Sequence, residues 1–435
     1  MLKILANRTY RHLFLAQVIA LVGTGLATVA LGLLAFDLAG AQAGAVLGTA
    51  LAIKMTAYIG VAPIAAAFAE RLPRRAMLVS LDLVRALVAL ALPFVTEVWQ
   101  VYVLIFALQS ASAAFTPTFQ ATIPDILPDE DDYTRALSLS RLAYDLESVA
   151  SPMLAAALLT VISFHNLFAG TVIGFLASAA LVATVVLPKA KPTPRRSIYE
   201  RTTRGMRIFL ATPRLRGLLA LNLTVAAASA MVIVNTVVLV QSRFALPQSS
   251  TAFALAAFGG GSMVAALVLP RLLKNIKDRT AMLFGGGVLV AGLAVGINLT
   301  TYNFLLPMWM LLGVGYSLAQ TPSGRLLRRS AHVEDRPALF AAQFSLSHAC
   351  WLITYPLAGW LGANINLTAS FVGLSVVAGS ALVVSIVIWR PAHDQESIKH
   401  THEKLPDDHI HLDGQDGIDH EHPYVIDDQH RRWPS

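Results

Sequence analysis

The sequence predicts an all-α membrane protein with twelve transmembrane helices and a polar C-terminal tail. Of its 435 residues, 55% are hydrophobic and only 14% are charged, and the mean hydropathy is +0.61. Soluble domains carry about 25% charged residues, so this composition indicates a protein that crosses the membrane many times. Long apolar segments recur up to Arg390, whereas eight of the twelve histidines lie after it.

Each transmembrane helix needs about 20 consecutive, mainly apolar residues. Twelve segments meet this requirement, at approximately 12–36, 44–69, 76–96, 98–120, 136–162, 166–187, 215–240, 250–273, 280–300, 304–324, 338–362 and 367–389. The N-terminal sequence runs directly into the first of them without a small-residue cleavage site. We therefore expect the N-terminus to be retained.

Lysine and arginine residues gather in alternate loops between these segments, which predicts the orientation of the protein. Loops of this kind stay in the cytoplasm. We therefore predict a multi-pass protein of the inner cell membrane with both termini in the cytoplasm. The tail carries eleven of the 26 acidic residues but four of the 33 basic ones, so the basic excess belongs to the membrane part. Topology explains this excess, and no nucleic-acid partner is expected.

The two halves of the membrane part resemble each other at an offset of 204 to 205 residues. RRAML at Arg74–Leu78 recurs as DRTAML at Asp278–Leu283, and Thr116–Pro117 recurs as Thr321–Pro322. Parallel six-helix repeats are a plan of secondary transporters. The predicted parts are an N-terminal six-helix half, a basic linker, a C-terminal six-helix half and a disordered tail, at residues 1–188, 189–214, 215–390 and 391–435.

The loop after the second segment carries a family motif. Its sequence AFAERLPRRAML, at Ala67–Leu78, resembles the D-R-x-G-R-R motif of the major facilitator superfamily. Three arginines match the motif, whereas Glu70 replaces its Asp and Pro73 replaces its Gly. The number of segments, the alternation of charged loops and the internal repeat also resemble this superfamily, so the resemblance covers all twelve segments. It implies the major facilitator fold of two six-helix halves.

Charged residues of this loop and of the inner end of the third segment predict a cytoplasmic gate. Such a network would set the balance between conformations and not the selectivity for substrate. Its predicted members are Glu70, Arg71, Arg74, Arg75, Asp82 and Arg85.

Two further stretches and the tail narrow the resemblance. YDLESVASP at residues 144–152, FSLSHACWLITYPLAGW at residues 344–360 and the histidine-rich tail are similar to the nickel-resistance exporters. This resemblance implies proton-driven export of Ni²⁺, with Co²⁺ or Fe²⁺ as further substrates. The same wider group also contains siderophore exporters, so the fold does not define the substrate.

Few charged or metal-binding side chains lie inside the apolar segments. A charged side chain at mid-bilayer costs roughly 2.5 to 3.5 kcal/mol, so each one must be paired with an opposite charge, be solvated or serve the function of the protein. Asp145 and Glu147 lie in the fifth segment, His348 and Cys350 in the eleventh, and Lys54 in the second. A carboxylate and an imidazole that face one cavity suit Ni²⁺, Co²⁺ or Zn²⁺. These five residues form the predicted site for metal or protons.

Structural roles compete with each of these assignments. Arg141 and Asp145 could form an ion pair one turn apart, and His348 could be a core histidine. Cys350 lies about 200° around the helix from His348, which favours a small buried hydrophobe over a ligand to the same ion. Lys54 could be a counter-ion to the fifth segment, or a built-in cation that the metal must displace.

The tail predicts a second place for metal binding. Its histidines alternate with acidic residues, and imidazole and carboxylate groups bind divalent first-row metals. It lacks helical or strand periodicity and contains four prolines, so we expect disorder without metal. The predicted ligands form three His-x-His pairs, His400 with His402, His409 with His411, and His420 with His422.

The sequence therefore predicts a monomeric secondary transporter in the lipid bilayer that exports a divalent metal ion in exchange for protons. No phosphate-binding loop and no nucleophile with its base are found, so neither ATP hydrolysis nor another enzymatic activity is expected. We expect no tightly bound cofactor, and the metal, Ni²⁺ or else Co²⁺, Fe²⁺ or Zn²⁺, is the substrate and the ligand of the tail. The alternatives are export of an organic molecule, such as a siderophore, metal chelate or drug, and a membrane metal sensor that transports nothing.

Overall fold

The structure is a computed structural model. It describes all residues other than 1, 70–72, 130–131, 133–135, 137–138, 141–142, 144–146, 148–149, 152, 188–197, 274, 333–334, 395–396, 402–418, 427–429, 431–432 and 434–435.

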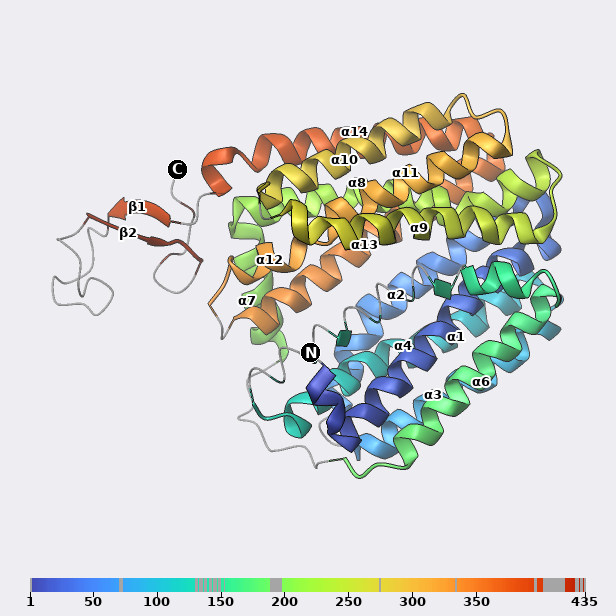
Figure 1. Cartoon of the computed structure of the whole chain (residues 1–435), viewed down its shortest axis with the longest axis horizontal. Coiled ribbons are helices and arrows are strands. Elements are labelled where there is room, and N and C mark those ends of the chain that lie inside the picture. Colours follow the sequence, from blue (N-terminus) through green and yellow to red (C-terminus); the bar gives the residue numbers. More distant parts are fainter. Residues whose placement is uncertain are drawn as a thin grey trace.

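The first half consists of long helices joined by short turns (Figure 1). Its helices are α1 (Arg8–Ala39), α2 (Ala43–Ala69), α3 (Arg74–Ala91), α4 (Val98–Ile126) and α6 (Phe164–Ala183). Single-turn helices η1 (Leu2–Ala6), η2 (Gly40–Gln42) and η3 (Leu92–Phe94) lie beside them. Described residues of the fifth predicted segment, among them 153–158, are also helical.

The second half repeats this plan. Its long helices are α8 (Pro213–Val237), α9 (Gln248–Leu272), α10 (Asp278–Gly296), α11 (Tyr302–Gln320), α13 (Arg336–Asn364) and α14 (Leu367–Ile388). Shorter elements are α7 (Ile198–Ala211), which lies in the predicted linker, η4 (Val238–Arg243) and α12 (Ser323–Arg328). Within the described residues, nine helical stretches are long and apolar enough to cross a membrane, the first of them containing α1 and most of α2. The predicted all-helical membrane fold is confirmed.

Local capping explains where several of these helices begin. The Asn7 side chain accepts a hydrogen bond from the Tyr10 amide at 3.1 Å, and the Asn366 side chain accepts one from the Ala369 amide at 2.7 Å. Gln100 accepts from the Glu97 amide at 3.1 Å in a capping box. Such caps satisfy the amides of the first helical turn, which otherwise have no partner.

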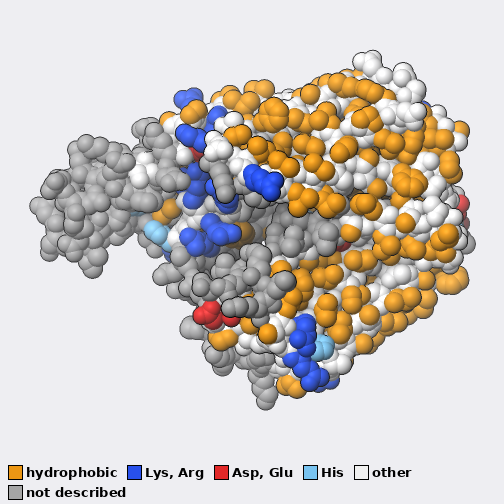
Figure 2. Space-filling view, viewed as in Figure 1, with side chains coloured by type: hydrophobic (Ala, Val, Ile, Leu, Met, Phe, Trp, Pro, Cys, Tyr) orange, Lys and Arg blue, Asp and Glu red, His pale blue; other side chains and the backbone are white. Residues whose placement is uncertain are grey.

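The outer faces of the helices are apolar, as contact with lipid requires. Exposed residues include Leu87 and Phe94 in the first half and Phe284 in the second. Figure 2 shows hydrophobic side chains over most of the visible bundle, with Lys and Arg gathered at one end. We call this the basic end. It is the end at which α1, α3 and α8 begin and near which both termini lie (Figure 1).

Ion pairs at the basic end reflect the internal repeat. Arg74 at the start of α3 pairs with Asp125 near the end of α4. In the second half Asp278, at the start of α10, pairs with Arg325 of α12 at 3.6 Å. Corresponding helix ends are thus joined in both halves, with the charges exchanged.

The tail differs from the predicted disorder in the parts that the structure describes. A short helix η5 (Pro391–Asp394) is followed by strands β1 (Ser397–Thr401) and β2 (Asp419–Pro423), which pair antiparallel. Sequence periodicity missed these strands because each is only five residues long and mostly polar. Backbone pairing, and not an apolar stripe, defines this ribbon.

Candidate transport site between the two halves

The two halves meet along α2 and α13. In Figure 1 they converge at the end opposite the basic end and diverge toward it. A Cβ atom on Gly359 would lie 2.1 Å from the Gly44 carbonyl oxygen, and one on Gly48 would lie 2.5 Å from the Tyr355 carbonyl oxygen. These distances leave no room for a side chain. Glycine is therefore required where the two backbones touch.

Asn235 of α8 supports this contact from the second half. Its side-chain amide donates to the Ala358 carbonyl at 3.1 Å and to the Ser370 hydroxyl at 2.9 Å. A Cβ atom on Gly44 would lie 2.8 Å from the Asn235 Oδ1 atom. Asn235 thus joins α8, α13 and α14 beneath the first turn of α2.

His348 lies farther along the same contact, in an aromatic cluster. Its ring centroid is 3.9 Å from that of Phe344, 5.4 Å from that of Tyr58 on α2 and 6.2 Å from that of Trp351. The Nδ1 atom is 2.6 Å from the Phe344 carbonyl oxygen. Because a carbonyl oxygen can only accept, Nδ1 carries a proton, and the lone pair for a metal or a second proton belongs to Nε2.

Lys54 and Glu147 bring opposite charges to this region from the first half. The Lys54 ammonium lies 5.9 Å from the centre of the Tyr58 ring. It is also close enough to both Glu147 and His348 for their charges to interact. Lys54 thus lies near two of the other predicted site residues, Glu147 on its own half and His348 on the other. Asp145 lies outside the described residues.

Glu147 is held close to α1 by a glycine. A Cβ atom on Gly25 would lie 2.1 Å from the Ser151 side chain and 2.8 Å from the Glu147 Oε1 atom. The hydroxyl of Ser151 is buried and has no hydrogen-bond partner among the described residues. A buried hydroxyl of this kind can donate or accept a hydrogen bond with a water molecule.

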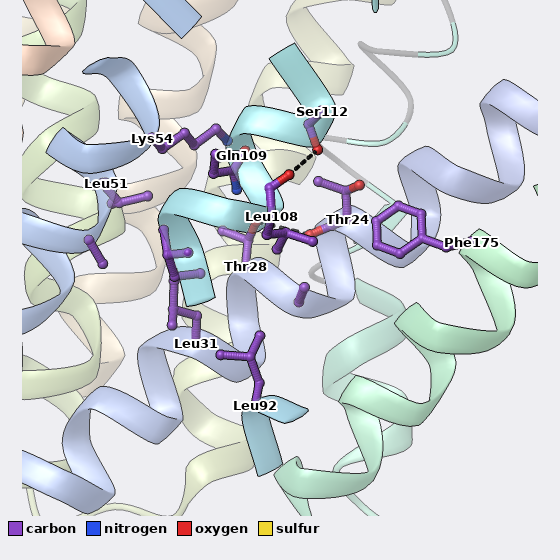
Figure 3. A pocket seen from close by; sticks show the side chains of 13 residues that line it. Thr24, Thr28, Leu31, Leu51, Lys54, Leu92, Leu108, Gln109, Ser112 and Phe175 are labelled. Carbon is purple, nitrogen blue, oxygen red and sulfur yellow. Dashed lines mark hydrogen bonds between the residues drawn. The ribbon is translucent and has the colours of Figure 1, made fainter. Parts of the chain in front are cut away.

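A small cavity extends from Lys54 into the first half (Figure 3). Its polar lining includes Thr24, Thr28, Gln109 and Ser112. Figure 3 shows the Lys54 side chain running toward Gln109, whose Oε1 atom is buried without a partner among the described residues. The volume of about 20 Å³ is enough for one water molecule and too small for an organic substrate.

Cys350 faces away from this site. Its thiol lies 3.5 Å from the Leu346 carbonyl oxygen and 4.0 Å from that of Leu219 on α8, inside the second half. The residue is 7% exposed. This placement agrees with the predicted separation from His348 around the helix.

The predicted gate residues occupy two separate places. Arg74 is paired with Asp125 at the basic end, whereas Glu70 and Arg71 lie outside the described residues. Asp82 and Arg85 are buried and paired with each other inside the first half.

The Asp82–Arg85 pair joins three helices of one half. The Ser178 hydroxyl of α6 donates to Asp82 at 2.7 Å, and the Arg85 guanidinium lies 4.1 Å from the Phe115 ring centre and 4.5 Å from that of Phe175. A gating role for these residues stays a prediction, and their described contacts link α3 to α4 and α6.

Sequence reasoning missed Tyr58 and the three contact glycines. Tyr58 follows Lys54 by four positions and therefore shares its helix face, a signal that was present in the sequence. Gly44, Gly48 and Gly359 could not be recognised, because small residues are frequent in membrane helices and only a neighbouring backbone makes one of them necessary.

The described tail residues arrange some histidines by strand pairing. His400 of β1 is opposite His420 of β2, and His422 is opposite Ile398. His402, His409 and His411 lie outside the described residues. Within the described part of the chain, no group of three potential metal ligands is found.

Two six-helix halves that meet around buried polar residues define a secondary active membrane transporter. The family model of the Major Facilitator Superfamily matches residues 13–297 and 218–410. The chain belongs to this superfamily.

Similar proteins include transporters of known and unknown substrate. The uncharacterized transporter YfiS of Bacillus subtilis strain 168 is 22% identical over 327 residues, which cover 70% of this chain and 76% of that protein. Macrolide efflux protein A of Streptococcus pyogenes is 26% identical over 153 residues, which cover 33% of this chain and 38% of that protein. That match spans less than half of either chain.

Solved structures show the same fold at low identity. A bacterial homologue of the human lysosomal transporter Spinster, inward-facing and unoccupied, has a TM-score of 0.69 at 13% identity, covering 88% of this chain and 98% of that one. A D-xylose–proton symporter has a TM-score of 0.65 at 12% identity, covering 90% and 98%. These matches establish the architecture alone.

Proposed function

We propose that this transporter exports a divalent transition metal ion, Ni²⁺ first among the candidates, in exchange for protons. The observation that supports the proposal is the position of Lys54 of the first half, whose charge interacts with Glu147 of its own half and which lies beside Tyr58, a neighbour of His348 in the other half. Imidazole nitrogen and carboxylate oxygen together suit borderline ions of this kind.

Competition between protons and metal for the same atoms would supply the coupling. A metal ion needs the lone pair of His348 Nε2 and the charged form of Glu147, so binding releases protons and protonation releases metal. Lys54 supplies a positive charge beside Glu147 when no metal is bound. A cation that enters the site would replace Lys54 as the partner of that carboxylate.

The charge distribution supports an orientation with the basic end in the cytoplasm. The halves then meet on the outer side, and the site is reached from the cytoplasm. A histidine-bearing tail at that same end fits export, because it would meet metal before the membrane site does.

Proton flux in liposomes tests this proposal. Purified protein is reconstituted with an internal pH dye, and Ni²⁺, Co²⁺, Zn²⁺, Fe²⁺ or Mn²⁺ is added in turn. We expect Ni²⁺ to drive a proton flux that depends on the protein. A protein that moves no protons with any of these ions, while its fold is intact by circular dichroism, is not a metal–proton antiporter.

The substitution His348→Ala is expected to weaken metal binding without removing the carboxylate of Glu147. We expect the Ni²⁺ concentration for half-maximal flux to rise about tenfold, which corresponds to about 1.4 kcal/mol of binding. His12→Ala, which changes a half-buried histidine at the basic end, is the matched control and should leave this concentration unchanged. If both variants reach half-maximal flux at the same Ni²⁺ concentration, His348 is not a ligand of the transported metal.

Export of an organic molecule is the second candidate, and the aromatic cluster favours it. Tyr58, Phe344 and Trp351 surround His348 and offer planar apolar surface beside one positive and one negative charge. The likeness to macrolide efflux protein A over a third of this chain points the same way. Drug-dependent proton flux in the same liposomes, with no response to metals, would establish this function instead.

A further inference from the structure

The end of the tail packs into the membrane part. Tyr424, Val425 and Ile426 are 6%, 6% and 1% exposed, and His430 is 3% exposed. Tyr424 and Ile426 belong to the same buried apolar cluster as Trp389, the residue that follows α14. Residues of a free polar tether would be solvated, so this segment is bound.

Arg214, near the start of α8, is the centre of the pocket that receives the segment. It is 1% exposed. Its guanidinium donates to the Arg329 carbonyl and to the Ser330 hydroxyl, both at 2.9 Å, and to the Tyr424 carbonyl at 3.4 Å. The last of these bonds joins the body to the tail.

Aromatic side chains of the tail complete the pocket. The Trp433 ring centre lies 5.1 Å from the Arg214 guanidinium carbon, within the range of a cation–π interaction. Tyr424 packs edge-on against Trp433 at 5.2 Å and against His430 at 4.5 Å. The tail thus covers a buried arginine with a carbonyl oxygen and an aromatic face, two groups that suit a guanidinium.

The other end of the tail is fixed at the same place. Asp394 of η5 pairs with Arg329 and accepts a hydrogen bond from the Trp389 indole at 3.2 Å. Strand β1 begins at Ser397, three residues later, and β2 ends at Pro423, immediately before Tyr424. Both ends of the ribbon are therefore attached to one wall, formed by Arg214, Arg329 and Trp389.

We propose that the described residues at the end of the tail, Tyr424–Ile426, His430 and Trp433, are a built-in docking element for the Arg214 pocket at the basic end. Its binding, together with the Asp394 contacts, holds the histidine-bearing ribbon of β1 and β2 at a fixed position beside the transporter. The tail is then an anchored module and not a mobile tether. This docking does not depend on the nature of the transported substrate.

Hydrogen exchange of the full-length protein in the absence of metal tests the docking. Buried, packed backbone exchanges only through local opening, so the peptide covering residues 424–430 should be protected. Trp433→Ala removes the ring over Arg214 and should speed exchange of this peptide at least about tenfold, because the population of the open form rises. Trp433→Phe keeps an aromatic face and should retain most of the protection.

The matched control is Trp99→Ala, since Trp99 is 62% exposed on α4 and belongs to the other half. It should leave exchange of the 424–430 peptide unchanged. Exchange of that peptide at the rate of unstructured chain in the unmodified protein, or equal protection in W433A, would overturn the proposal. Exchange in W433F as fast as in W433A would overturn the role assigned to the aromatic ring. None of these outcomes bears on metal transport, which the liposome assay measures separately.

Discussion

Replacement of Glu147 by Gln is expected to abolish proton-coupled transport. The amide has nearly the same shape, so the side chain can keep its place beside Gly25, but it can neither release nor take up a proton. It also leaves Lys54 without its nearby negative charge. An uncompensated charge in the membrane costs about 2.5 to 3.5 kcal/mol, so we expect lower thermal stability as well.

The double variant E147Q/K54M separates charge balance from proton transfer. Lys54→Met alone should destabilise the protein because it leaves Glu147 uncompensated. Together the two changes remove both charges, and we expect stability to recover in part while proton flux stays absent. The measurements are unfolding temperature in detergent and proton flux in liposomes. Proton flux at the unmodified rate in E147Q would mean that Glu147 carries no coupling proton.

The substitution Gly48→Val is expected to disrupt the contact between the two halves. Its Cβ atom would lie 2.5 Å from the Tyr355 carbonyl oxygen, which belongs to backbone and cannot move alone. Overpacking of this kind costs about 1 to 3 kcal/mol. This free-energy cost applies only to the conformation in which α2 touches α13. The equilibrium between that conformation and one in which the two helices are apart would therefore shift about 5- to 150-fold toward the second.

Distances between spin labels measure this shift. Labels attached through A41C and I365C, in a C350S background, report on exposed positions of the two halves at the end where they meet. We expect G48V to lengthen the distance between them. Gly60→Val is the matched control, because Gly60 lies on the same helix and a Cβ atom there meets nothing within 4 Å. An unchanged distance in G48V would show that the backbone contact does not close that end.

Much of the helical architecture follows from hydrophobic segments of sufficient length. The eleventh predicted segment, 338–362, lies within α13, and the twelfth, 367–389, differs from α14 by one residue at its end. Such segments are recognisable because each spans the bilayer by itself and satisfies its own backbone hydrogen bonds. The repeated sequences that begin at Arg74 and Asp278 likewise coincide with the starts of α3 and α10.

Predictions about side chains succeeded where they depended on one helix. The separation of His348 from Cys350 follows from helical geometry, and the two do face different surroundings. The tail ribbon could not be predicted, because its two strands form by pairing with each other across 17 intervening residues, and Tyr424, which follows β2, is held at the Arg214 pocket. Neither interaction is visible in the local sequence.

The sequence by itself determined the class of fold, the number of membrane segments and the residue types available for a transport site. These properties depend on composition and on periodicity along one helix. The tertiary structure alone decided that Tyr58 lies beside His348, that Gly48 must lack a side chain, and that Arg214 receives the end of the tail. Each of these depends on distances between residues far apart in the chain, which packing of whole helices sets and local sequence does not encode.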